Sequence, residues 1–374
     1  MKRAETLIYG ALLVVTLGAA WMVRNAEEPA EESGTVVFDP GAAGVTKMTW
    51  DDETSVATIE VSGKGDDLTT WVVAGKKEKI ETPVASSGDD DDSSGDDDSA
   101  GDDDSAAAET TQPAEPEVEV TYGEPKLRRF PGNATAKKLV ESFSPLEALR
   151  SFDQLEPDAL SEMGLDEPKG SLTVESGSGS VTFVIGDKAY GSSDTYVRME
   201  GKDTVFLVSS KDLSPLRGAE NRLIERVLVD GEEADITGAS LLVGGQPAGP
   251  KRVHSGRHDK NNSFWAAAGS PDDKDTVFGG FMEKALALRA SSFPTDDEVP
   301  EEATISSVFR LQLDVDGGDA QVLELGKKLD SDKSTEEEQV FAWFARSSRT
   351  RDRWAVVSKA TAGDLADLLA EVTE

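Results

Sequence analysis

Two histidines four residues apart are the first side chains whose spacing could support chemistry. On a helix, His254 and His258 would share one face and could supply two metal ligands. The intervening Ser255-Gly256-Arg257 disfavours a helix, and neither a zincin glutamate nor a third clear ligand accompanies the pair. We therefore interpret the pair as part of a polar loop, and we expect no metal site and no cofactor.

Four arginines near the C-terminus form the main basic concentration of the chain outside its termini. They are Arg346, Arg349, Arg351 and Arg353. One interpretation is a hairpin turn surrounded by water. The other is an electrostatic contact with the acidic surface of a partner, or with this chain's own aspartate-rich segment. We take these four arginines as the candidate partner-contact site.

Carboxylates are abundant, but their pattern does not indicate a reaction centre. Pairs such as Asp166-Glu167 and Asp296-Asp297 could perform acid-base chemistry, yet in so acidic a chain they are typical of solvated turns. The sequence contains no Walker A loop, no Gly-x-Ser-x-Gly elbow and no Gly-x-Gly-x-x-Gly dinucleotide loop. We therefore do not expect an enzyme.

The charge balance disfavours nucleic acid as a partner. The 374 residues include 73 acidic and 38 basic side chains, a formal net charge of −35, so phosphate backbones are repelled. Cysteine is absent, which removes disulfides, Cys-ligated zinc and the lipidated cysteine of a lipoprotein. Any attachment to a membrane must use another anchor.

Much of the negative charge is concentrated in residues 86–119. This stretch contains 10 Asp and 4 Glu and has no Lys or Arg. Such a composition cannot form an apolar core, so we predict a disordered acidic insertion. Calcium binding is an alternative, but the aspartate spacing does not match an EF-hand loop, and weak counterion condensation is the simpler interpretation.

The elements that would position these groups begin with an apolar N-terminal run. Residues 6–23 are almost uncharged, follow Lys2 and Arg3, and precede Arg24. This pattern predicts a signal anchor or transmembrane helix over residues 1–24, then an acidic spacer over 25–35. A cleaved signal peptide is the alternative, because Gly18-Ala19-Ala20 offers small residues near a cleavage point.

The pattern of the rest of the chain predicts two related modules, residues 36–226 and 227–374. Phe183–Ser209 and Val322–Ser358 share one order of strand, glycine turn, two further strands and a helix cap. We predict an α+β fold: an N-terminal transmembrane helix followed by two related modules of antiparallel β-meander plus short helices.

Local signals refine this internal repeat. Gly186-Asp187 is interpreted as a turn, and Trp71 and Trp265 are expected in the cores of their modules. Helix caps are predicted at the starts of helices by Asn133 with Thr135, by Ser209, by Ser270 and by Thr361, and at a helix end by Gly164.

Several stretches give the chain a resemblance to a known family. They are the N-terminal apolar segment, Trp71, Met163-Gly164-Leu165-Asp166-Glu167-Pro168 with its preceding helix, Ile185-Gly186-Asp187, Tyr196-Val197-Arg198 and Val205-Phe206-Leu207-Val208. The chain resembles, over most of residues 36–230, the bacterial family called domain of unknown function 4340. That resemblance implies a membrane-anchored extracytoplasmic protein, often encoded beside gliding-motility-type ABC transporter components. It brings no catalytic motif.

The functional expectation combines the anchor with the resemblance. We expect a noncatalytic accessory or scaffold protein in the bacterial inner membrane, single-pass, with its C-terminal bulk in the periplasm. Its partners would be an ABC transporter or envelope proteins. The alternative is an envelope ligand-binding protein, or a degenerate enzyme, with a pocket between the two modules. The oligomeric state stays open.

Overall fold

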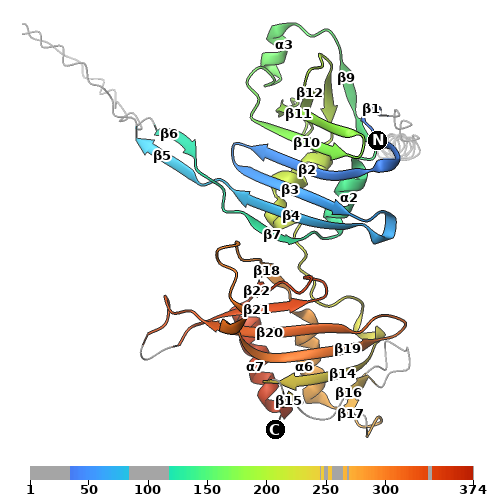
Figure 1. Ribbon diagram of the computed structural model, residues 1–374, viewed down its shortest axis with the longest axis vertical. Helices are drawn as coiled ribbons and strands as arrows, with labels where there is room; N and C mark the ends of the chain where they lie inside the picture. The colour runs from blue at the N-terminus through green and yellow to red at the C-terminus, as the bar shows by residue number, and fades with distance from the viewer. Residues whose placement is uncertain are drawn as a thin grey trace, which may run out of the picture.

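The computed structural model describes residues 34–83, 118–244, 246–247, 252–254, 264–267, 269–335 and 339–373. Within these residues no helix is both long and apolar enough to cross a membrane. The predicted anchor at residues 6–23 lies outside them. The fold is α+β, as predicted, and the described strands pair antiparallel in two large sheets and two small ones (Figure 1).

The first sheet has nine strands in the order β7-β4-β3-β2-β10-β11-β12-β13-β9. Their bounds are β2 (Val45–Asp52), β3 (Ser55–Ser62), β4 (Thr69–Lys76), β7 (Arg128–Pro131), β9 (Arg150–Phe152), β10 (Gly170–Ser176), β11 (Gly179–Lys188), β12 (Thr195–Met199) and β13 (Val205–Val208). A separate pair, β1 (Thr35–Phe38) with β8 (Leu146–Ala148), accompanies it. This part of the chain is called the first module below.

The second sheet also has nine strands, in the order β17-β16-β14-β19-β20-β21-β22-β18, with β15 paired to β14. Their bounds are β14 (Ile236–Val243), β15 (Gln246–Pro247), β16 (Arg252–His254), β17 (Trp265–Ala267), β18 (Ala290–Ser292), β19 (Ser306–Val315), β20 (Gln321–Leu329), β21 (Phe341–Ser347) and β22 (Ala355–Val357). This part is called the second module.

The two sheets follow the same path. In each, three strands form a meander, a helix follows, and one short strand crosses to the far edge (β9 or β18). The chain then returns beside its starting strand, β2 or β14, and runs outward through four strands to meet that edge strand. The first sheet differs by its additional edge strand, β7.

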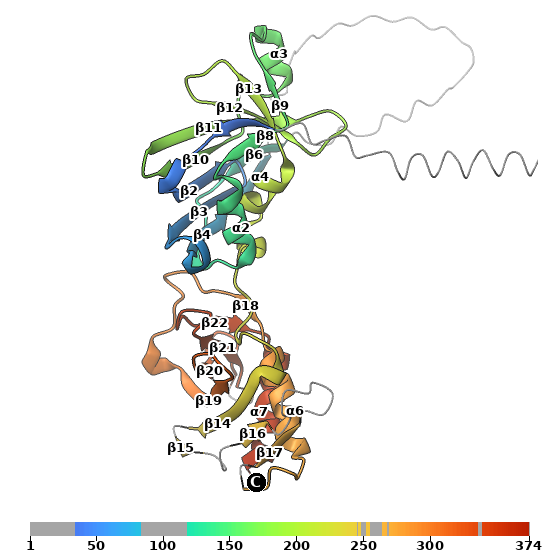
Figure 2. The same cartoon turned by 90° about the vertical axis from the view of Figure 1, so that its right-hand side faces the viewer.

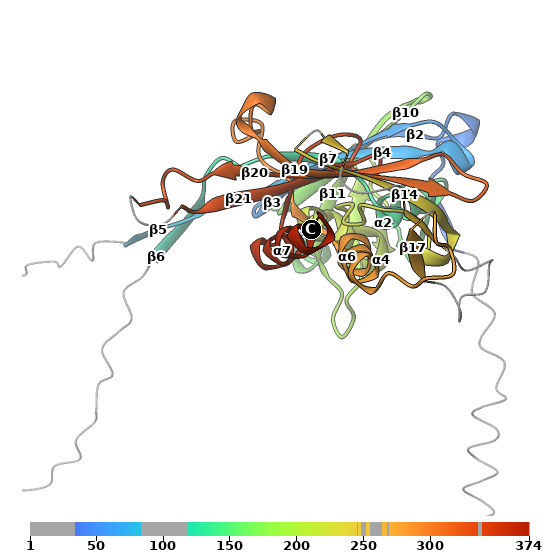
Figure 3. The same ribbon diagram turned by 90° about the horizontal axis from the view of Figure 1, so that it is seen from below.

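The main helices lie on the same side of both sheets. In the first module these are α2 (Ala134–Ser142) and α4 (Ser210–Arg217), and in the second α6 (Thr276–Ala287) and α7 (Lys359–Thr373). Figures 2 and 3 show all four on one side, with the opposite side of each sheet largely free of helices. Two shorter helices are α3 (Pro157–Glu162), beyond β12 and β13, and α5 (Ala219–Arg222).

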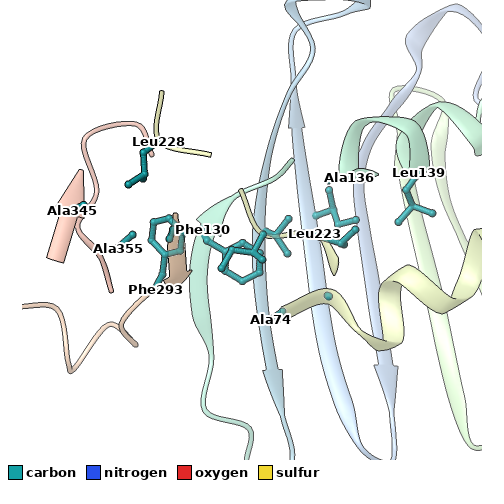
Figure 4. Packing of buried hydrophobic residues seen from close by; sticks show 14 of the residues in the cluster. Ala74, Phe130, Ala136, Leu139, Leu223, Leu228, Phe293, Ala345 and Ala355 are labelled. Atoms are coloured by element: carbon teal, nitrogen blue, oxygen red, sulfur yellow. The ribbon is translucent and has the colours of Figure 1, made fainter. Parts of the chain in front are cut away.

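The buried side chains form one cluster that continues from one module into the other. Phe130 of β7 and Phe293, just after β18, are each 1% exposed and stack with ring centroids 6.1 Å apart. Figure 4 shows this pair between Leu223 on one side and Leu228, Ala345 and Ala355 on the other. A shared core of this kind couples the modules by hydrophobic burial.

A two-stranded arm leaves the first sheet between β4 and β7. It consists of β5 (Lys79–Pro83) and β6 (Val118–Tyr122), and Figure 1 shows it projecting from the body of the molecule. Val118 and Glu119 therefore belong to a strand, although the acidic insertion was predicted to extend through residue 119. Residues 84–117, which hold the rest of that predicted insertion, lie outside the described residues.

Two local predictions are wrong, one about a turn and one about burial. Gly186 lies inside β11, not in a turn, and Trp71 is only partly buried. In β4 the inward positions are Thr70, Val72 and Ala74, and strand alternation places Trp71 on the other side. Trp265, in contrast, is 2% exposed and lies in the core as predicted.

The predicted caps are confirmed in the first module but not in the second. Asn133 accepts hydrogen bonds from the amides of Thr135 and Ala136, and Ser209 accepts one from Lys211. Gly164 has a φ of 66° and ends α3, with Leu165 donating back to the Leu160 carbonyl.

In the second module both helices begin elsewhere. Helix α6 starts after Asp275, whose carboxylate accepts from Phe278 N, whereas Ser270 lies in a preceding turn. Helix α7 begins at Lys359, before the predicted cap at Thr361.

Candidate functional site

The four candidate arginines lie at and near the turn between β21 and β22. Ser347 and Thr350 close this turn, because Ser347 N donates to Thr350 Oγ1 and Thr350 Oγ1 donates to the Ser347 carbonyl. The next two residues have left-handed backbones, with φ 51° at Arg351 and 60° at Asp352. Such conformations cost about 1 kcal/mol or more per non-glycine residue, so the surrounding contacts must hold this turn.

Arg346 is bound entirely within the second module. Its guanidinium lies 2.9 Å from Glu324 and 2.8 Å from Glu302, and it stacks over the Trp354 ring at 4.3 Å. Burial disfavours its charge, but the hydrogen bonds and attraction of the two carboxylates outweigh burial and raise the pKa of Arg346. This arginine therefore fastens the segment that precedes β19 onto β20 and β21.

Arg349 reaches the segment that connects the modules. It pairs with Glu225 at 2.5 Å and with Asp230 at 3.4 Å. The Glu225 side chain is only 7% exposed and also accepts from Val227 N, while the backbone N–H of Glu225 donates to the Pro131 carbonyl. Arg349 thus neutralises a buried carboxylate at the passage from the first module to the second.

Arg351 crosses to the first module. Its guanidinium carbon lies 4.6 Å from the centroid of the Trp71 ring, and that of Arg129 lies 5.0 Å from the same ring. Arg129 pairs with Glu60, whereas within the described residues Arg351 forms no ion pair. Burial first, and repulsion by Arg129 second, lower the pKa of Arg351.

Arg353 makes the longest ion pair among the four arginines. It lies 3.7 Å from Asp296, whose side chain is 85% exposed. Nearby, Arg128 on the first module pairs through its backbone with Thr295 on the second. Because Arg349 and Arg351 both reach across to the first module or the connecting segment, the structure places the predicted arginines chiefly at the junction. Their contact with an external partner stays a prediction.

A pocket of about 270 Å³ lies at this junction, between the start of α2 and the β21–β22 turn. Its polar lining includes Thr69, Asn133, Lys137, Glu225, Arg349 and Arg351. Neither Lys137 nor Glu225 was singled out from the sequence. No sequence pattern distinguishes them, because each reaches the pocket through contacts between segments far apart in the chain.

A second hollow, of about 510 Å³, opens beside the ends of β2, β10 and β11. Arg217 lies over the Trp50 ring at 5.5 Å and 3.8 Å from Asp52, while Lys169 and Asp187 are 3.4 Å apart. These opposite charges satisfy one another across the hollow. Gly186 and Asp187 line it, so the segment that the sequence presents as a turn forms one wall of this hollow.

The remaining sequence candidates do not converge on either hollow. His254 is in β16, and His258 lies outside the described residues. No group of three or more His, Cys, Asp or Glu in the described part of the chain could hold a metal ion. Asp166 and Asp297 are exposed, and a hydrogen bond from Ser161 lowers the pKa of the Asp166 carboxyl.

The family resemblance rests on residues that meet in space. Asp187 N donates to the Met163 carbonyl at 2.8 Å, and Arg198 donates to the Leu165 carbonyl at 3.3 Å. Residues 128–307 match the family described as Domain of unknown function (DUF4340). The predicted resemblance is confirmed.

The matched region differs in extent from the predicted one. It begins at β7, so Trp71 and the N-terminal apolar segment lie outside it, and it continues across the junction to the start of β19. Comparisons with curated proteins and with solved structures found no match.

Proposed function

We propose that this DUF4340-like protein is a noncatalytic, membrane-anchored accessory or scaffold protein whose body lies outside the cytoplasm. The apolar pattern of residues 6–23 motivates the anchor. Work beside an ABC transporter or envelope assembly is what the resemblance stated in the sequence analysis implies. The observation that carries the scaffold role is the shared orientation of the two sheets. Their helix-free sides face the same way (Figure 3).

On the first module this open side presents a regular polar row. Thr58, Thr49, Thr173 and Thr182 lie opposite one another on four adjacent strands. Neighbouring strands are about 4.8 Å apart, so these half-exposed hydroxyls form an evenly spaced line across the sheet. On the second module Arg310 and Gln312 of β19 are exposed between buried Phe309, Leu311 and Leu313. Two wide sheet faces of this kind suit contact with another protein.

The junction supports a single platform built from both faces. The Phe130–Phe293 stack, the Arg349–Glu225 pair and the Arg351–Trp71 contact all join the modules or their connecting segment. Hydrophobic burial and a neutralised buried charge resist independent motion of the two sheets. A partner would therefore meet two surfaces held in a fixed relation.

The two modules are, in this proposal, related copies. Gly186 and Gly326 occupy equivalent strands, β11 and β20, and each lies against an aliphatic side chain from the segment before the returning strand, Leu165 or Ile305. Two positions earlier, Val184 pairs with Arg198 and Glu324 pairs with Arg346. Shared path and shared local packing support duplication of one unit.

Co-purification tests the transporter association. The full chain, extracted from membranes in mild detergent, is expected to retain transporter or envelope subunits through washing. Carbonate extraction in parallel reports the anchor, because an integral helix stays with the membrane fraction. Consistent recovery without any such subunit, or release by carbonate, would contradict the proposal.

A second candidate function is supported by the pocket at the junction. An envelope ligand-binding protein would place its ligand where two modules meet, a common position for small-molecule sites. The approximately 270 Å³ pocket has this position and a largely polar lining.

A further inference from the structure

The junction pocket has a charge opposite to that of the chain as a whole. Its lining contains three cationic side chains, Lys137, Arg349 and Arg351, and one carboxylate, Glu225. That carboxylate is already satisfied by Arg349 at 2.5 Å and by Val227 N at 2.9 Å. Within the described residues, neither Lys137 nor Arg351 has an ion-pair partner. The pocket thus retains two uncompensated positive charges in a chain of net charge −35.

Arg351 is held in place at an energetic cost. Its own backbone and that of Asp352 are left-handed, and its guanidinium is confined against Trp71 close to Arg129. Burial and the neighbouring arginine disfavour the charge of Arg351 and lower its pKa. A strained residue whose charge has no partner is a feature that a bound group can explain.

An oxyanion would compensate the two unpaired cations of the lining, Arg351 and Lys137, together. Guanidinium groups donate planar pairs of hydrogen bonds to carboxylate and phosphate oxygens, and a lysine ammonium adds a point charge. The Trp71 face keeps the Arg351 guanidinium oriented, so little side-chain entropy remains to be lost on binding. A neutral ligand would leave the repulsion between Arg351 and Arg129 in place.

We infer that the pocket between the modules binds a small molecule through a phosphate or carboxylate group, held by Arg351 and Lys137. This inference deepens the second candidate function and does not depend on the scaffold role. Binding there would contact α2 of the first module and the β21–β22 turn of the second simultaneously. The ligand would therefore also stabilise the junction.

Titration calorimetry on the full chain tests the inference, with inorganic phosphate and succinate as separate probes. Working at about 20 mM ionic strength keeps the local attraction unscreened, and chloride at the same ionic strength is the control. We expect saturable binding of at least one probe, and the better probe distinguishes phosphate from carboxylate chemistry. Binding should also raise the melting temperature.

Three variants locate the site. Arg351→Gln and Lys137→Gln should each weaken binding about tenfold, equivalent to loss of one charged hydrogen bond. Lys138→Gln, at the exposed neighbouring position on α2, should leave binding unchanged. Lys137→Gln keeps the test decisive if Arg351→Gln disturbs the strained turn.

The inference is overturned if neither probe gives saturable heat, or if Lys138→Gln weakens binding as much as Lys137→Gln. A neutral ligand retained in native mass spectrometry, without phosphate or succinate binding, would also overturn it but would leave the ligand-binding function standing. Partner co-purification is a separate measurement, so its outcome reports only on the scaffold role.

Discussion

The side chain of Leu165 lies directly against Gly186, in the space that a Cβ atom would need. A Cβ built on Gly186 would lie 3.0 Å from Leu165 Cδ2 and would overlap the Met163 carbonyl oxygen. The same relationship recurs between Ile305 and Gly326 in the second module. In both sheets a glycine inside a strand allows the preceding segment to dock against it, so close approach and not turn geometry explains these glycines.

Gly186→Ala should destabilise the first module. The added methyl group must displace backbone at Met163 or move Leu165, which is 1% exposed, and overpacking of this kind costs about 1–3 kcal/mol. Chemical denaturation should show a lower midpoint. Gly326→Ala should have a comparable effect in the second module, because Ile305 occupies the corresponding space.

A glycine in open surroundings serves as the control. A Cβ atom on Gly363 in α7 would meet nothing within 4 Å apart from its chain neighbours and the backbone of its own helix. Alanine there should be neutral or stabilising by about 0.5–1 kcal/mol, because glycine is unfavourable inside helices. Equal stability of Gly186→Ala and the parent protein would contradict the docking explanation.

Phe293→Ala should weaken the coupling between the modules. It removes one ring of the buried Phe130–Phe293 stack, and losses of this type cost about 3–5 kcal/mol. We expect the thermal unfolding transition to broaden or divide into two, measured by calorimetry. Leu149→Ala, at a side chain 52% exposed, should change little. A single sharp transition with an unchanged midpoint would argue against a shared core.

Arg349→Met should destabilise the protein more than the double change of Glu225→Gln with Arg349→Met. The single change leaves the Glu225 carboxylate buried without its cation, a penalty of about 1–3 kcal/mol. Removing both charges avoids that penalty. A double-mutant cycle in urea measures the coupling, and purely additive effects would show that the pair contributes nothing specific.

Glu302→Gln should change stability in a pH-dependent way. The Trp354 indole N–H at 3.0 Å, followed by Arg346, holds the pKa of Glu302 below its usual 4.5. A lowered folded-state pKa stabilises the protein above the unfolded value, and that contribution disappears as pH falls through the folded value.

The parent should therefore be the more stable protein at pH 7, by less than about 1 kcal/mol because Glu302 is largely exposed. Denaturation midpoints at pH 7 and pH 3 give the comparison. Glu301→Gln, at the neighbouring exposed position, is the control. A gap between parent and Glu302→Gln that persists unchanged at pH 3 would contradict the assignment.

Much of the architecture is encoded locally and could be predicted. Strand alternation and side-chain caps at Asn133 and Ser209 are short-range signals, and the structure has both. The caps at Ser270 and Thr361 were wrong because other residues nearby, Asp275 and those around Ser358, begin the helices. When several neighbouring residues could each cap a helix, the sequence alone does not say at which of them the helix begins, because tertiary packing decides this.

The candidate site depended on contacts that sequence does not show. The sequence shows that four arginines are concentrated within residues 346–353. It does not show their contacts with Glu225, Asp230 and Trp71, which lie in the connecting segment and in the other module. Trp71 was expected in the core because tryptophan is usually buried. One position in strand register moves a side chain to the opposite face, and here that position brings Trp71 to the junction.

Site-specific photo-crosslinking in intact membranes tests the scaffold role most directly. A photoreactive residue is placed at Thr49 or Gln312 on the helix-free sides of the two sheets, and at Lys138 on α2 as the control. The proposed function predicts a discrete membrane-protein partner captured from Thr49 and Gln312 but not from Lys138. No captured partner from either sheet face, or capture from Lys138 alone, would contradict it.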